Sequence, residues 1–175
     1  MSEEKTISLY QQQKAAKPLI EDVVPEIIPD GNVRKAVLDF VAHLRANKMP
    51  LRWSGVNSWR AFYKGKGICS IALGNIAWTG KISDFWHVAP RPSHMDDHDE
   101  SIMNAGLQKI IWNNIKYCNS CGGCAPGREM TISGREFKGI CHGLTLIFFD
   151  PDETEVEGIK KLLELEKKAR DEAAK

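Results

Sequence analysis

The sequence lacks an excess of charge of either sign. Its 24 lysines and arginines nearly balance 23 aspartates and glutamates, the formal net charge is +1, and basic residues are interleaved with acidic ones. A chain without a long-range positive field does not attract DNA, RNA or an anionic membrane over distance. We therefore expect neither a nucleic-acid partner nor a membrane partner, and the sequence leaves open which small molecule or protein it binds and its oligomeric state.

Long hydrophobic runs are also missing. No segment approaches the ~20 consecutive apolar residues of a membrane-spanning helix. The first residues, MSEEKTISLYQQQKAAK, begin with acids and contain no apolar stretch of the kind found in secretory signals. The sequence thus predicts a cytoplasmic protein, and in that reducing compartment clustered cysteines are more often metal ligands or redox groups than disulfides.

Motifs for nucleophilic or phosphate chemistry are absent as well. The sequence contains no G-x-S-x-G elbow, no Walker loop and no Rossmann fingerprint. The glycines of Lys64-Gly65-Lys66-Gly67 fit a tight hairpin between two strands, because no helix follows them to hold a phosphate. Catalysis is not indicated.

The remaining pattern predicts one α+β domain. Residues 1–28 are polar and interrupted by prolines, which indicates an extended or partly mobile N-terminal arm. Residues 29–175 have the length and composition of a single domain that includes the cysteine segment 118–141. Asp30 is a candidate cap for a helix that ends at Met49-Pro50.

Strands follow that helix as far as residue 90. The runs SWRAFY, ICSIAL, IAWTGKI and DFWHVA are separated by short turns, which favour an antiparallel meander over parallel pairing. Apolar spacing then predicts a helix over about 96–117, LTLIFF reads as a buried strand, and Asp150-Pro151 begins a last helix. The expected fold is an antiparallel sheet with helices packed on one face, plus a metal-pinned loop with four cysteines.

The most informative segment is YCNSCGGCAPGREMTISGREFKGICHG. Cys118, Cys121 and Cys124 are each separated by two residues, and Cys141 follows after sixteen more. Two intervening residues allow a tight turn to direct two sulfurs at one ion. The stretch from Met130 to Cys141 reads as a hairpin that turns near Ser133-Gly134, which would return Cys141 to the other three.

Zinc suits ligation by four cysteines, and a structural zinc site would stabilise a loop region with little core of its own. The same run also resembles the cysteine run of ferredoxin-type [4Fe–4S] proteins, although the usual fourth cysteine before a proline is missing. We therefore keep zinc as the leading cofactor and an iron–sulfur cluster as the alternative. The alternative without a metal is that these four cysteines are free thiols in a glycine-rich loop. The fifth cysteine, Cys69, is expected to be a small core residue.

Two other features have both a functional and a structural interpretation. On a helix, His94 and His98 would share a face and could form a secondary metal site, but the acids from Asp96 to Glu100 are also typical of a solvated helix start. Four aromatic residues crowd the strand region and could line a ligand pocket, although aromatics usually pack in the core of a sheet. These residues are Trp59, Tyr63, Trp78 and Trp86.

Two parts of the sequence carry a family resemblance. The helix followed by MPLRWSGVNSWRAFYKGKGICSIALGN, within residues 30–115, resembles small bacterial α+β proteins that include a frataxin-like group proposed to act as iron chaperones. That resemblance implies iron bound on acidic surface residues, of which the cluster from Asp96 to Glu100 is the candidate here. The ending CGGCAPGREMTISGREFKGICHG resembles a cysteine-bearing ending of uncharacterised proteins of anaerobic bacteria.

Together these observations predict a non-catalytic binding or regulatory module with a structural zinc site. The alternative is a small iron–sulfur redox or iron-handling protein that uses the same four cysteines. A small enzyme that uses the aromatic pocket is a third hypothesis, which would require convergent polar groups inside a cavity.

Overall fold

The structure is a computed structural model that describes residues 8–74, 77–78, 81–82, 84–92, 99–118 and 126–174. It is a mixed α+β fold built on an antiparallel sheet, as the sequence predicts. The main sheet has five strands in the order β1-β2-β3-β6-β9. Its strands are β1 (Leu51–Gly55), β2 (Ser58–Tyr63), β3 (Lys66–Leu73), β6 (Trp86–Pro90) and β9 (Phe148–Phe149).

Every neighbouring pair in the main sheet is antiparallel. The turn between β2 and β3 lies at Lys64 and Gly65, whose φ angles are both positive, at 47° and 78°. Two successive positive φ angles are typical of the tight hairpin turns that match the twist of antiparallel strands. The expected hairpin is therefore present, and β1 adds an edge strand in front of it.

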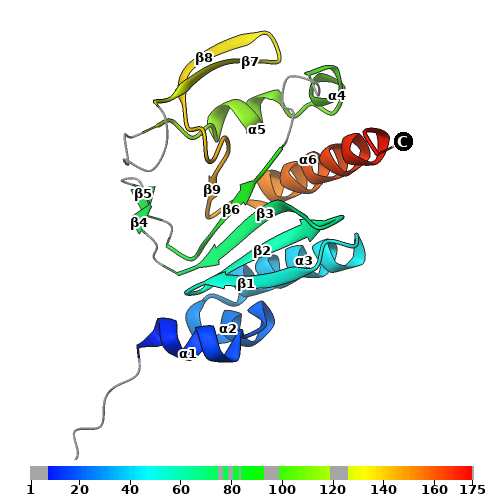
Figure 1. Cartoon of the computed structure of the whole chain (residues 1–175). Helices are drawn as coiled ribbons and strands as arrows, with labels where there is room; N and C mark the ends of the chain where they lie inside the picture. Colours follow the sequence, from blue (N-terminus) through cyan, green and yellow to red (C-terminus); the bar gives the residue numbers. More distant parts are fainter. Residues whose placement is uncertain are drawn as a thin grey trace, which may run out of the picture.

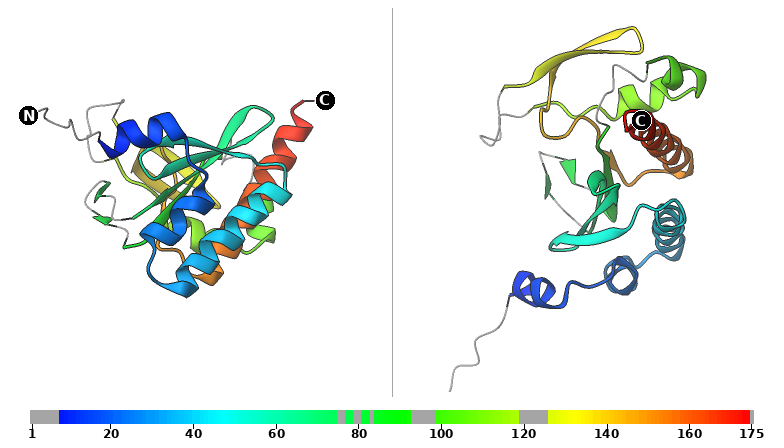
Figure 2. Two further views of the ribbon diagram at one scale, coloured as in Figure 1. Left: turned by 90° about the horizontal axis from the view of Figure 1, so that it is seen from below. Right: turned by 45° about the vertical axis from the view of Figure 1, so that its right-hand side comes forward.

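Helices α3 (Gly31–Ala46) and α6 (Glu153–Glu172) cover one face of this sheet (Figures 1 and 2). Asp30 caps α3 by accepting hydrogen bonds from the backbone N–H groups of Asn32 and Val33. Asp152 caps α6 in a capping box with Glu155. The expected helix starts are thus correct, except that the cap of α6 is Asp152 and not Asp150.

Asp150 does not cap a helix but binds the backbone at the start of β6. Its φ is +45°, and its carboxylate accepts hydrogen bonds from the backbone N–H groups of Asp84, Phe85 and Trp86 at 2.7 to 2.9 Å. The side chain therefore joins the start of β6 to the chain between β9 and α6.

The N-terminal segment differs from the expected extended arm. Residues 8–27 contain two helices, α1 (Leu9–Ala16) and α2 (Ile20–Ile27), and Ser8 caps α1 in a capping box with Gln11. Helix α2 buries Ile20, Val23 and Val24. Prolines do not exclude this arrangement because Pro18 precedes α2, while Pro25 lies near its end.

The helix expected over about 96–117 is also different. It is two short helices, α4 (Asp99–Asn104) and α5 (Gln108–Asn113), separated at Gly106, whose φ is +67°. A left-handed glycine ends a helix, and Met103 of α4 is 48% exposed. The chain then becomes extended before Cys118.

The described residues also form two small two-stranded sheets. The segment IAWTGKI, expected as one strand of the main sheet, instead contributes β4 (Ala77–Trp78) and β5 (Lys81–Ile82). These two strands pair with each other in a separate sheet. The hairpin β7 (Arg128–Ile132) and β8 (Arg135–Ile140) turns at Ser133 and Gly134, as predicted, and lies beside α5 (Figure 1). Of LTLIFF, residues 144–148 are buried.

The main core lies between the sheet and α3 and α6. Trp59 and Trp86 are each 1% exposed there, and the ring of Trp86 packs against Phe40 with their centroids 6.0 Å apart. Among the described helices, none combines the length and apolar character needed to span a membrane.

Candidate metal centre

Two of the four predicted cysteine ligands fall in the described part of the chain. Cys118 follows α5 and Cys141 follows β8, and both are half-buried. Cys121 and Cys124 lie within residues 119–125, outside the described residues. The geometry of the candidate site is therefore built from the segments on either side of that stretch.

The backbone segments of Cys118 and Cys141 lie side by side. The N–H of Cys118 donates to the carbonyl oxygen of Gly139 at 2.7 Å, and the N–H of Cys141 donates to that of Lys116 at 2.8 Å. These two hydrogen bonds enclose an antiparallel bridge between Tyr117 and Ile140. Residues separated by more than twenty positions in the sequence are thus neighbours across one bridge.

The β7–β8 hairpin produces this return of the chain. Its pairing shifts register between Arg128 and Met130, where the opposite strand carries one extra residue, and Gly139 there has a φ of +74°. A left-handed glycine at such a bulge bends a strand and increases its twist. Beyond the bulge, Ile140 is paired with Arg128 on one side and with Tyr117 on the other.

Gly127 brings the other end of the cysteine loop to the same place. A Cβ atom on Gly127 would lie 2.6 Å from the Cα and carbonyl carbon of Gly139. Because both contacts are with backbone, the close approach requires a residue without a side chain at position 127. Cys118 and Gly127 flank the stretch 119–126, and both of these residues contact Gly139.

The surroundings of Cys141 are apolar on one side. Cys141 packs against a buried cluster formed by Ala89 of β6 with Leu144 and Ile147. The segment 141–149 continues from this cluster to β9, whose Phe148 pairs with Val88. The candidate site therefore lies where the hairpin joins the main sheet.

Cys69 is a core residue, as the sequence predicts. Its side chain is buried in β3, and burial raises the pKa of its thiol to about 12. Metal binding and nucleophilic chemistry both require a thiolate, so this pKa makes Cys69 an unreactive thiol.

Over the described ranges, no group of three or more histidine, cysteine, aspartate or glutamate side chains gathers around a possible ion. His142 is exposed beside Cys141. His94 and His98, the possible secondary metal pair, lie outside the described residues.

The aromatic residues proposed as a pocket separate into two environments. Trp59 and Trp86 lie in the core, and the indole N–H of Trp59 donates to the carbonyl oxygen of Pro18 at 2.8 Å. The pocket interpretation is therefore wrong for these two side chains, while the side chain of Trp78 is outside the described part. Tyr63 is half-buried at the end of β2.

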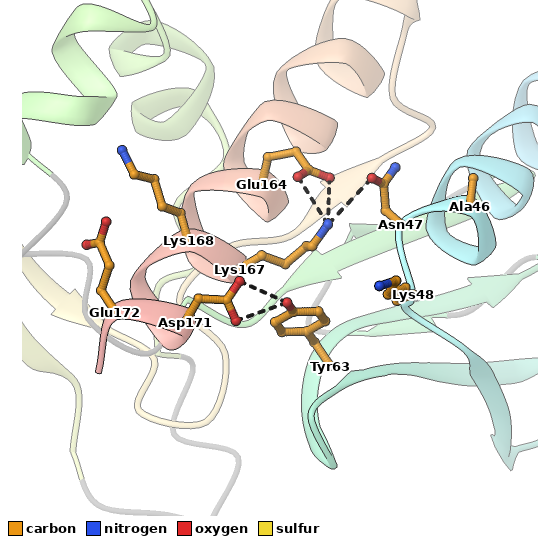
Figure 3. A pocket seen from close by; sticks show the side chains of 9 residues that line it. All are labelled: Ala46, Asn47, Lys48, Tyr63, Glu164, Lys167, Lys168, Asp171 and Glu172. Carbon is orange, nitrogen blue, oxygen red and sulfur yellow. Dashed lines mark hydrogen bonds and ion pairs between the residues drawn. The ribbon is translucent and has the colours of Figure 1, made fainter. Parts of the chain in front are cut away.

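Tyr63 lines an open groove of about 410 Å³ between the end of α3 and α6 (Figure 3). Its hydroxyl donates to the carboxylate of Asp171 at 3.0 Å, and Asp171 also pairs with Lys64 at 2.6 Å. Lys167 binds Glu164 and lies 5.5 Å from the centre of the Tyr63 ring. Tyr63, Lys64, Glu164, Lys167 and Asp171 are thus tied to one another, whereas the other charged residues that line the groove are Lys48, Lys168 and Glu172.

Arg52 and Arg60 are not among the site residues predicted from the sequence. The structure pairs Arg52 directly with Arg60 on the face of the sheet opposite α3 and α6. The alternation with buried Trp59 predicts which face Arg60 occupies, but only the strand register reveals its neighbour.

Comparison of the chain with models of protein families, with curated proteins and with solved structures found no match, so both resemblances suggested by the sequence stay predictions.

Proposed function

We propose that this protein is a non-catalytic binding or regulatory module of the cytoplasm in which Cys118, Cys121, Cys124 and Cys141 hold one structural zinc ion. The observation that carries the proposal is the hydrogen-bonded bridge that sets the backbone of Cys118 beside that of Cys141. A site built from distant parts of a chain requires such a return, and the bridge supplies it.

The direction of the side chains supports convergence. Side chains alternate between the two sides of an extended chain, so Cys118 and Cys141 both lie on the side opposite Tyr117 and Ile140. They occupy diagonal positions across the bridge, for which Cα atoms are typically about 7–8 Å apart. Two thiolates at that separation are able to share a metal ion through Zn–S bonds of about 2.3 Å.

Covalent geometry limits where the other two cysteines lie. Cys121 is three residues from Cys118, and Cys124 is three residues from Gly127, which touches Gly139. Three residues span at most about 11 Å. Cys121 is therefore tethered within that reach of Cys118, and Cys124 within that reach of Gly127, which supports a single site for all four thiolates.

The hairpin next to the cysteines has little core of its own. Ile132, Phe137 and Ile140 are its buried apolar side chains, and the other described positions of β7 and β8 are partly or fully exposed. A small region of this kind gains stability when a metal links its ends, because metal binding free energy becomes folding free energy. This is the role that we assign to the zinc ion.

Elemental analysis of anaerobically purified protein tests the proposal. We expect a colourless protein with one zinc ion per chain, and loss of zinc in Cys118→Ser, Cys121→Ser, Cys124→Ser and Cys141→Ser. Cys69→Ala is the matched control and should keep the ion, because that thiol lies in the core. A brown protein with iron and broad visible absorption would replace zinc with the iron–sulfur alternative. A protein without metal would contradict both.

A further inference from the structure

A row of polar side chains crosses the sheet face that α3 and α6 leave uncovered. Arg52 of β1 pairs with Arg60 of β2, Arg60 pairs with Ser70 of β3, and Ser70 pairs with Ala89 of β6. Residues directly paired across antiparallel strands have side chains on the same face. Arg52, Arg60 and Ser70 are therefore immediate neighbours on that face.

A third arginine joins the row from the end of β6. Arg91 is half-buried, its Nε donates to the hydroxyl of Ser70 at 3.3 Å, and its backbone N–H donates to the carbonyl oxygen of Ile68 at 2.8 Å. Burial, followed by the positive charge of Arg60, lowers the pKa of Arg91 from its ordinary value. The guanidinium of Arg91 thus lies against the hydroxyl of Ser70, and the charge of Arg60 is close enough to influence Arg91.

The positive charge of this row is not compensated. Across the described ranges, Arg52, Arg60 and Arg91 make no ion pair with a carboxylate, whereas Arg45 binds Glu21 and Arg170 binds Glu166. The Nε of Arg60 is buried and has no hydrogen-bond partner there. Like charges directly opposite each other destabilise a sheet, and a buried donor without an acceptor adds a further cost.

Two contacts hold the arginines along the sheet. The guanidinium of Arg52 lies 5.2 Å from the centre of the Phe62 ring. The aliphatic part of Arg60 passes over Gly67, where a Cβ atom would lie 3.0 Å from its Cδ. The absence of a side chain at Gly67 therefore leaves room for Arg60 to extend along β3.

We propose that Arg60, Arg91 and Ser70 form a binding site for a small phosphate-type dianion, with Arg52 at its rim. Guanidinium groups bind tetrahedral oxyanions through paired N–H donors, and the serine hydroxyl provides one more donor. Bound phosphate screens the repulsion between the arginines. The site does not use the cysteines, so it goes beyond the zinc proposal, although Cys141 packs against Ala89 at the end of the same row.

Titration with inorganic phosphate at constant ionic strength tests the site. With ¹⁵N-labelled full-length protein, we expect saturable shifts of the Arg60 Nε–H and of the Ser70 amide, and weaker binding of acetate by about tenfold or more because it carries one charge. Arg60→Gln and Arg91→Gln should each weaken phosphate binding about tenfold or more. Arg45→Gln, on α3 and paired with Glu21, is the matched control and should leave the phosphate affinity unchanged.

Thermal unfolding separates a binding role from a structural one. Without phosphate, Arg60→Gln should leave Tm unchanged or raise it, because the substitution removes a repulsive charge. Phosphate should raise the Tm of the unsubstituted protein but not that of Arg60→Gln. Ser70→Ala provides a second variant with a smaller change in shape and should also weaken binding. Phosphate shifts no larger than those of chloride, or a phosphate-dependent rise in Tm that survives in both Arg60→Gln and Ser70→Ala, would overturn the proposal.

Discussion

The two faces of the main sheet are stabilised in different ways. On the face covered by α3 and α6, Trp59, Ile71 and Trp86 are at most 1% exposed and pack into one apolar cluster. The opposite face carries Arg52, Arg60 and Ser70 at one side and the segment 141–149 at the other. Burial of apolar surface accounts for the first face, whereas the second face holds charges and thiols that we assign to an anion and a metal ion.

The two faces therefore differ in how far their stability depends on a bound ligand. Apolar side chains on the first face contact one another regardless of any ligand, and each well-buried large side chain contributes about 1.5–3 kcal/mol. The second face has few such contacts, because Ala89, Leu144 and Ile147 form only a small cluster. We therefore expect ligand removal to affect the second face and leave the first intact.

The largest expected effect is on the covered face. Trp86→Ala should lower the free energy of unfolding by about 3–5 kcal/mol, because it removes a fully buried ring that packs against Phe40. Urea unfolding followed by circular dichroism measures this change. Phe62→Ala, half-buried on the open face of the same sheet, is the comparison and should cost less than half as much. Equal losses would show that the two faces do not differ as described.

An intermediate effect is expected where the cysteine loop closes. Gly127→Ala places a Cβ atom 2.6 Å from the backbone of Gly139, and such overpacking costs about 1–3 kcal/mol. It should also reduce the zinc content, because the loop end is displaced from the bridge. Gly143→Ala is the matched control, since no heavy atom lies within 4 Å of its added Cβ. Urea unfolding and elemental analysis that gave the same result for both variants would count against this contact.

Some features of the fold follow from neighbouring residues in the sequence, whereas others depend on contacts between distant residues. The turn at Lys64-Gly65 and the cap at Asp30 were predictable, because glycine and aspartate act there through their nearest neighbours. The break at Gly106 was not, because a single glycine is tolerated within many helices. The row of arginines depends on strand register and on Arg91, more than twenty residues from Ser70 in the sequence, so local patterns could not reveal it.

The smallest expected effect concerns pH. His87 lies on the second face beside Phe149, and burial lowers its pKa below its ordinary value, against the opposing influence of Asp150. The folded chain therefore keeps His87 neutral. The contribution of His87 to the free energy of unfolding is fully present above the unfolded pKa of about 6.5, and it is lost as the pH falls below that value. The slope is at most about 1.4 kcal/mol per pH unit.

Urea unfolding between pH 5 and pH 8 measures this slope. His87→Gln should flatten the acid side of the profile, whereas exposed His142→Gln should leave its shape unchanged. His43, whose pKa is also lowered by burial, supplies part of the slope that remains. An unaltered acid slope in His87→Gln would place the pH dependence elsewhere in the chain.

Hydrogen exchange before and after metal removal is the most direct test of the division between the two faces. When a chelator removes the proposed zinc ion, the amides of Cys118 and Cys141 should exchange faster, because their hydrogen bonds to Gly139 and Lys116 would no longer be held by an ion. The amides of β3 should keep their protection, since they belong to the apolar core. Unchanged exchange at Cys118 and Cys141 after complete loss of metal would contradict a structural metal centre at that bridge.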